Sequence, residues 1–246
     1  MGEPRFGINK PRFYRYWVKE DDLVRFEAKV RETDLYISAS APLEKEAVRA
    51  IERHRKPIED FNKAHPEFQK TLKAYPPTET MAPIVYDMAA AAAKVGVGPM
   101  AAIAGAIADY VGADLLKQCE EVIVENGGDI FIKVQRPLTI GIYAGDSPFT
   151  GKLALQIRPE ETPLGICTSS GTVGPSLSFG TSDATVILAK TATFADACAT
   201  AVGNIVKDEA AIEKAIERAR DIDGIYGVVI IKGKKIGAWG NVRFAT

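Results

Sequence analysis

The chain has 246 residues, of which 46% are hydrophobic and 26% are charged. These proportions are ordinary for a folded protein and exclude a disordered or collagen-like chain. The 31 basic and 32 acidic residues leave a net charge of −1, so the chain as a whole has no positive field that would attract nucleic acid or an anionic membrane. We therefore expect no nucleic-acid partner.

The charged N-terminal residues and the shortness of the apolar stretches together predict a cytoplasmic protein. The first six residues carry charges and a proline where a signal peptide has its apolar region. The longest uncharged apolar stretch, residues 95–108, is shorter than the roughly 20 residues that a membrane span needs. Cys119, Cys167 and Cys198 form no paired-cysteine motif, which disfavours both a disulfide framework and a structural zinc site.

The first half of the chain predicts a β-hairpin followed by helices. Polar and apolar residues alternate in two short runs, as in paired strands, and apolar residues then recur at helical spacing. Pro66 should interrupt the second helix because it lacks an N–H donor. Residues 1–246 should form one domain, with a sub-lobe break near the proline pair at 75–80. In chain order, the expected elements are strands over 24–30 and 34–40 and helices over 42–55, 57–72, 81–94 and 99–118.

The second half predicts a sheet and two further helices. Short turns separate its strand patterns, so most neighbouring strands should run antiparallel. In chain order, the expected elements are strands over 121–125, 129–135, 137–144, 153–158 and 185–189, helices over 193–206 and 209–220, and a closing hairpin over 227–238. The fold class is therefore α+β, a mainly antiparallel sheet with helices packed on one face.

Two segments have the composition of ligand-holding turns. Asn126, Gly127, Gly128 and Asp129 lie between two expected strands, and paired glycines let a backbone approach a ligand closely. The same string is also a common hairpin turn. Residues 162–182 carry no charge and are rich in glycine, serine and threonine, a composition that holds phosphate oxygens through hydroxyl and backbone N–H groups. An ordinary loop has this composition too.

A third segment pairs a carboxylate with a hydroxyl. Asp196 and Thr200 are four residues apart in an expected helix, so they point from the same face, one turn apart. Both supply the hard oxygen atoms that Mg²⁺ prefers, and Mg²⁺ takes its remaining ligands from water and phosphate. The plainer alternative is an aspartate favoured by the helix dipole.

Taken together, these three segments resemble the ApbE superfamily of flavin transferases, which move FMN from FAD onto a protein threonine with magnesium at the pyrophosphate. Asn126-Gly-Gly-Asp129 is similar to that family's N-x-G-G-D segment, and Thr168-Ser-Ser-Gly171 to its T-S-G segment. Ala195-Asp-Ala-Cys-Ala-Thr200 is similar to its A-D-A-x-x-T segment. The whole chain resembles an uncharacterised branch of the superfamily found largely in archaea and anaerobic bacteria.

The resemblance implies an ApbE-like, T-fold-like fold with FAD or FMN as ligand and Mg²⁺ as cofactor. Asp196 and Thr200 map onto metal ligands, and Asp129 and Asp196 onto catalytic positions, with Asp129 a second ligand or a base. The implied flavin-nucleotide site comprises Asn126, Gly127, Gly128, Thr168, Ser169, Ser170, Gly171, Thr172 and Gly174.

One departure from the family argues against transfer chemistry. Flavin transferases carry a histidine and a D-P-x-T-G string between the last two segments, whereas residues 172–194 here contain neither. Three hypotheses stand: a nucleotidyl or FMN transferase, a non-catalytic flavin-binding protein, and, as the resemblance to that branch implies, a protein of anaerobic sulfur assimilation and homocysteine formation. The third would use Cys167 or Cys198 as a reactive thiol. Homo-oligomerisation stays open.

Overall fold

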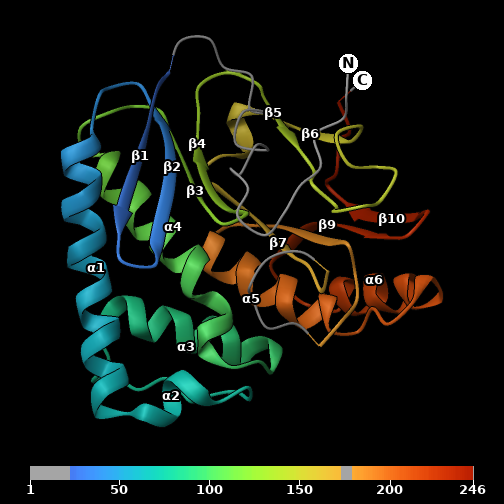
Figure 1. Ribbon diagram of the computed structural model, residues 1–246, viewed down its shortest axis with the longest axis horizontal. Helices are drawn as coiled ribbons and strands as arrows, with labels where there is room; N and C mark the ends of the chain where they lie inside the picture. Colours follow the sequence, from blue (N-terminus) through green and yellow to red (C-terminus); the bar gives the residue numbers. More distant parts are fainter. Residues whose placement is uncertain (1–22, 173–178, 246) are drawn as a thin grey trace.

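A computed structural model describes residues 23–172 and 179–245 (Figure 1). The strands are β1 (Val24–Val30), β2 (Thr33–Ala39), β3 (Val122–Asn126), β4 (Asp129–Lys133), β5 (Leu138–Gly141), β6 (Ala154–Ile157), β7 (Leu164–Ser169), β8 (Ala184–Ala189), β9 (Ile225–Lys232) and β10 (Lys235–Gly240). The helices are α1 (Glu44–Ala64), α2 (Pro66–Lys70), α3 (Pro83–Val95), α4 (Ile103–Leu115), α5 (Ala192–Gly203) and α6 (Ile212–Arg220), with short 3-10 turns η2 (Pro99–Ala102), η3 (Pro159–Glu161) and η4 (Glu209–Ala211).

The fold is built on one large antiparallel sheet. Its eight strands lie in the order β1-β2-β3-β4-β7-β8-β9-β10, and every neighbouring pair is antiparallel. The expected strands over 137–144 and 153–158 form a separate two-stranded sheet, β5 with β6. The predicted α+β class with a mainly antiparallel sheet is confirmed.

The helices cover one face of this sheet, and β5 with β6 covers the other (Figure 1). Successive side chains of a strand point to opposite faces, and β8 follows this rule. Ile187 and Ala189 join the core beneath the helices, while Val186 and Leu188 join the core beneath β5 and β6. The expectation of helices on one face is confirmed, and the second face is closed by a hairpin instead of being left to solvent.

Two local expectations were wrong. Helix α1 continues through Pro57 instead of ending before it, because Ala50, Ile51 and Ile58 on its apolar face are buried on both sides of the proline. The uncharged segment 162–182, expected as a loop, contains the central strand β7. The glycine, serine and threonine content of the segment is typical of a loop, so the composition did not predict this strand, which is buried on both faces.

Residues 75–80, where the sequence predicts a sub-lobe break, lie in the connection between α2 and α3, and the break itself stays a prediction. The single-domain organisation of residues 1–246 stays a prediction. Within the described part of the chain, no single helix is long and apolar enough to cross a membrane, although α3 and the η2–α4 segment, bent by 107° from each other, pass that length and composition test as a pair.

Candidate functional site

The turn between β3 and β4 places the first predicted segment against α4. Asn126 pairs with Asp129 across the turn, and Gly127 and Gly128 have φ values of +71° and +107°, a conformation that glycine adopts without strain. The Asn126 side-chain amide donates a hydrogen bond of 3.0 Å to the carbonyl of Ala104 in α4. The turn is therefore fixed on the first residues of that helix.

Asp196 lies in α5 and faces the same helix start from the other side. Its Oδ2 accepts a hydrogen bond of 3.0 Å from the backbone N–H of Gly105. Helices α4 and α5 approach so closely here that a Cβ on Gly105 would lie 2.2 Å from the carbonyl oxygen of Ala192. Burial, and then the negative charge of Asp129, hold the pKa of Asp196 well above its ordinary value, although the backbone N–H groups of α4 oppose this shift.

Asp129 begins β4 and lies opposite Cys167 of β7 in the sheet register. Burial raises the pKa of Asp129 to about 7, and the charge of Glu125 adds to the rise, while the nearby Cys167 side chain and the backbone N–H of Thr168 lower it. The charge of Asp129 raises the pKa of Asp196, and the charges of both raise the pKa of Cys167. Ionising these three groups together is therefore unfavourable. The structure thus brings the two predicted catalytic carboxyls close enough for the charge of Asp129 to raise the pKa of Asp196.

The protein alone does not complete a metal site in the described residues. Over 23–172 and 179–245, no group of three or more His, Cys, Asp or Glu side chains has the arrangement of a metal centre. Thr200 lies one turn beyond Asp196 on α5, as the spacing predicted, and is half-buried. A cation held by these groups would complete its coordination with phosphate oxygens and water, as Mg²⁺ usually does.

The hydroxyl-rich segment runs from the end of β7 toward the surface. Thr168 and Ser169 end the strand, and a Cβ on Gly128 would lie 3.9 Å from the side chain of Thr168, so the first two predicted segments are neighbours. A Cβ on Gly203, one turn after Thr200, would lie 3.6 Å from the Ser169 hydroxyl. The face of α5 that carries Asp196 and Thr200, which are half-buried, therefore leads toward the end of β7.

The remaining predicted residues lie farther out. The Ser170 hydroxyl lies 3.3 Å from that of Thr172, whose own hydroxyl donates to Asp183 at 3.2 Å. A Cβ on Gly171 would lie 2.1 Å from the carbonyl of Gly180, so only glycine fits there. The predicted residue Gly174 lies outside the described residues.

The sequence reasoning missed Asp109 of α4. Its carboxylate accepts hydrogen bonds from the backbone N–H groups of Ala192 and Thr193, at 2.9 and 2.8 Å, and from the Thr193 hydroxyl at 2.6 Å. One signal could have found it, because Asp109 is the first charge after the uncharged stretch 95–108. An aspartate inside such an apolar helix needs partners, and the start of α5 supplies them.

The two cysteines nearest the predicted segments are poor thiolates. The Cys167 thiol donates a hydrogen bond of 3.2 Å to the carbonyl of Ala192. Burial, with the charges of Asp129 and Asp196, raises the pKa of Cys167 well above its ordinary value. Burial also raises the pKa of Cys198, to about 12. Thiolate chemistry is therefore disfavoured at both positions.

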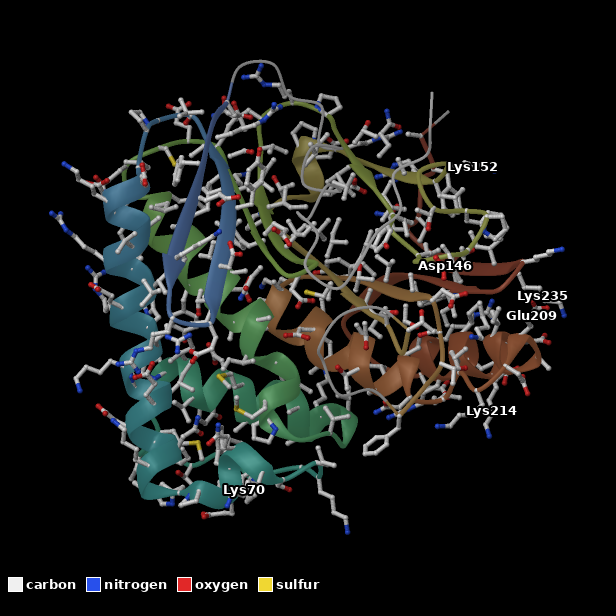
Figure 2. The ribbon with its side chains drawn as sticks, in the orientation of Figure 1. Lys70, Asp146, Lys152, Glu209, Lys214 and Lys235 are labelled. Atoms are coloured by element: carbon white, nitrogen blue, oxygen red, sulfur yellow. The ribbon has the colours of Figure 1, made fainter. Side chains whose placement is uncertain are left out.

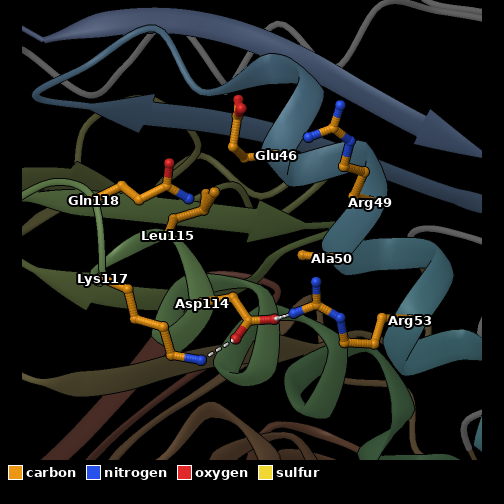
Figure 3. Close-up of a pocket in the computed structure, with 8 residues that line it drawn as sticks. All are labelled: Glu46, Arg49, Ala50, Arg53, Asp114, Leu115, Lys117 and Gln118. Atoms are coloured by element: carbon orange, nitrogen blue, oxygen red, sulfur yellow. Dashed lines mark hydrogen bonds and ion pairs between the residues drawn. The ribbon is translucent and has the colours of Figure 1, made fainter.

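Two cavities lie away from these segments. One of about 160 Å³ is open between α1 and α4, where Asp114 binds Arg53 at 2.8 Å and Lys117 at 2.6 Å (Figure 3). The other, of about 570 Å³, lies between α6 and β10, and its lining includes Glu209 and Lys235 (Figure 2). Neither cavity is lined by a residue that the sequence predicted for the site.

Comparison with known proteins gives relatives along most of the chain. A family model described as "AbpE bacteria" matches residues 15–229. A UPF0280 protein of Methanocella arvoryzae is 42% identical over 214 residues, covering 87% of each chain. A UPF0280 protein of Methanosarcina acetivorans is 41% identical over 216 residues, covering 87% of this chain and 85% of the relative.

Solved structures give the same fold at low identity. A mutant of the flavin transferase ApbE from Vibrio cholerae has a TM-score of 0.58 at 13% identity and covers 89% of this chain and 97% of its own. The ApbE protein from Thermotoga maritima has a TM-score of 0.56 at 14% identity and covers 87% of this chain and 96% of its own. The predicted ApbE-like fold and the resemblance to an uncharacterised archaeal branch are confirmed.

Proposed function

We propose that this chain, which belongs to the family described as AbpE bacteria, binds the pyrophosphate of FAD, or the phosphate of FMN, together with Mg²⁺ at Asp196 and Thr200. A function related to flavin transfer is what the family and the fold suggest. The observation that carries the proposal is the pair of neighbouring carboxyls, Asp129 and Asp196, of which the first raises the pKa of the second. Neither has a lysine or arginine among the main influences on its pKa.

Such a pair fits a divalent cation on electrostatic grounds. Both carboxyls have raised pKa values, chiefly because burial disfavours their charged forms. The charge of Glu125 adds to the rise at Asp129, and the charge of Asp129 adds to the rise at Asp196. A bound Mg²⁺ supplies the positive charge that makes both ionised forms favourable and neutralises phosphate oxygens at the same time. Asp196 and Thr200 would hold the cation, with Asp129 as a second ligand or as a base.

The flavin nucleotide would lie along the hydroxyl groups and backbone that follow β7. Thr168 and Ser169 are half-buried beside the α5 face, and the β3–β4 turn at Gly127 and Gly128 has no side chains to obstruct a ligand. Two of the solved ApbE proteins with this fold are named a flavin transferase and a flavinyl transferase, which supports a flavin as the ligand. We place the protein in the cytoplasm as part of this proposal.

Catalysis of flavin transfer would need a base as well as a bound flavin nucleotide. Asp129, with a pKa of about 7, is suited to accept a proton near neutral pH. The interval 172–194 contains no histidine, so the histidine-bearing loop of flavin transferases has no counterpart there. The thiol alternative is disfavoured by the raised pKa values of Cys167 and Cys198. Binding of a flavin nucleotide is therefore the function to test first.

The test is a calorimetric titration of the flavin-stripped protein with FAD, FMN and ATP, with and without Mg²⁺. The variants are Asp196→Ala and, as a matched control, Asp114→Ala, which removes an aspartate of α4 whose partners line the separate cavity in Figure 3. We expect Mg²⁺-dependent binding of FAD or FMN in the wild type and the control. In Asp196→Ala it should weaken by at least about 30-fold, since losing a charged partner costs roughly 2 kcal/mol or more.

Two results would contradict the proposal. One is the failure of the wild type to bind any of the three nucleotides in the presence of Mg²⁺. The other is an Asp196→Ala variant that melts at a lower temperature than the wild type but binds flavin equally well, since Asp196 would then be a purely structural residue.

A further inference from the structure

Helices α4 and α5 hold each other's first turns through two carboxylates. The first turn of an α-helix has backbone N–H groups without partners in the helix itself. In α5 these groups include Ala192 and Thr193, and both donate to Asp109 of α4, at 2.9 and 2.8 Å. In α4 they include Gly105, which donates to Asp196 of α5 at 3.0 Å. Each helix thus caps the start of the other.

Glycines let the two helices come close enough for this exchange. A Cβ on Gly105 would lie 2.2 Å from the carbonyl oxygen of Ala192, and a Cβ on Gly165 of β7 would lie 2.2 Å from the backbone nitrogen of the same residue. The start of α5 is therefore held between α4 and the sheet by backbone-to-backbone contact.

Asp109 fixes the part of α5 from which Asp196 projects. Asp196 follows Ala192 by four residues, which is one helical turn. Apart from Asp109, the start of α5 has the cap of Thr191, whose hydroxyl accepts from the Phe194 N–H at 3.2 Å. Asp109 accepts three hydrogen bonds, the shortest of 2.6 Å from the Thr193 hydroxyl. Asp109 therefore makes more hydrogen bonds to the start of α5 than Thr191 does.

We propose that Asp109 is a positioning residue for the candidate cation and nucleotide site: by holding the first turn of α5 against α4, it sets the place and orientation of the Asp196 carboxylate. This inference rests on the proposed function for its consequence, but not for its geometry. Asp109 acts through the position of α5 and does not need to contact the ligand. Partners that orient a metal ligand from behind typically change metal affinity by about 10- to 100-fold.

The experiment compares Asp109→Ala and Asp109→Asn with Asp208→Ala. Asp208 is a matched control, because its carboxylate also accepts two backbone N–H groups at a helix start, those of Ala210 and Ala211 at 2.9 and 3.0 Å, but this start precedes α6 and is neither in α4 nor in α5. Three quantities are measured for each protein: the melting temperature, the affinity for FAD at saturating Mg²⁺, and the hydrogen-exchange rate of the Gly105 amide.

We expect the alanine variants at 109 and 208 both to lower the melting temperature, since both remove a helix cap. Only Asp109→Ala should weaken FAD binding, by about tenfold or more, and speed exchange of the Gly105 amide beyond that of amides elsewhere in α4. Asp109→Asn keeps one acceptor oxygen but turns a donor toward the remaining N–H, so it should have an intermediate effect. This variant also serves if the alanine variant does not fold.

The outcomes separate the two proposals. Weakened binding in both Asp109→Ala and Asp208→Ala, in proportion to lost stability, would overturn the positioning role. Unchanged binding and unchanged Gly105 exchange in Asp109→Ala would overturn it as well. If the wild type binds no flavin, the proposed function fails, and Gly105 exchange alone decides whether Asp109 positions Asp196.

Discussion

Replacing Gly105 by alanine tests whether the close contact of α4 and α5 supports the candidate site. The added Cβ would lie 2.2 Å from the Ala192 carbonyl oxygen, 2.5 Å from its carbon and 2.9 Å from the Cβ of Asp196. Ordinary contacts between such atoms begin near 3.5 Å. Two of the three obstacles are backbone atoms, which have no rotamer to change, so the helices would have to separate by about 1 Å.

The sign of the effect follows from two opposing contributions. Alanine is better than glycine in a helix interior by about 1 kcal/mol. Overpacking costs about 1 to 3 kcal/mol, and a backbone obstacle places this site at the upper end. We expect a net loss of about 2 kcal/mol, which for a chain of this length lowers the melting temperature by roughly 4 to 8 °C.

The matched control is Gly203→Ala in α5, a second helical glycine, where the nearest atom to an added Cβ is 3.4 Å away. Thermal unfolding followed by circular dichroism should give a control within about 2 °C of the wild type, because a change in stability of about 0.5 kcal/mol is expected without a clash. Gly105→Ala should also lose flavin affinity, since the Asp196 carboxylate moves with α5. A Gly105→Ala protein as stable as the control would refute the close-contact reasoning.

Three further predictions follow from single residues. The pKa of Asp129 is about 7 in the folded protein and ordinarily 3.8. Between these values the folded protein keeps a proton that the unfolded chain releases. Relative to Asp129→Asn, the wild type should therefore lose stability as the pH rises from about 4 to about 7, by up to about 1.4 kcal/mol per pH unit. Urea denaturation across this range checks it, and parallel pH profiles of the two proteins would contradict it. Native Cys167 should resist iodoacetamide until the protein is unfolded, because burial raises its pKa and hides it; mass spectrometry of the labelled peptide reports this, and rapid labelling of the folded protein would count against it. Pro57→Ala should raise the melting temperature, because alanine restores the N–H that proline removes from the interior of α1, and a lower melting temperature would show that the ring's packing matters more.

Elements with a strong local pattern were predictable from the sequence. The β3–β4 turn follows from two adjacent glycines flanked by alternating residues, and the break between α3 and η2 follows from a glycine before Pro99. Strand β7 was not predictable in this way, because Gly165 and Ser169 are weak strand formers. Its place in the sheet comes from pairing with β4 on one side and β8 on the other, and that information lies in distant segments.

The same limit applied to the site. Asp196 and Thr200 are one helical turn apart, so their spacing alone predicts that they share a face. The role of Asp109 depends on backbone groups that come 83 and 84 residues later in the chain, and no local pattern announces such a partner. Family resemblance marked the residues that would face a ligand, and it gave no indication of the residue that holds one of them from behind.

The physical case for the site comes from comparing three aspartates whose carboxyls are partly or wholly buried. Burial raises the pKa of Asp114, but its contacts with Lys117 and His54 outweigh that effect and leave the pKa below its ordinary value. Asp109 has no cation among its main influences, but three hydrogen-bond donors satisfy it. Asp196 has no cation among its main influences, and its backbone hydrogen bonds do not offset burial and the negative charge of Asp129, so its pKa stays raised. Folding two coupled acids into one place lowers stability, and proteins retain such an arrangement chiefly where a bound cation or a reaction uses it. The raised pKa values of Asp129 and Asp196 therefore support the proposed site on grounds separate from the family resemblance.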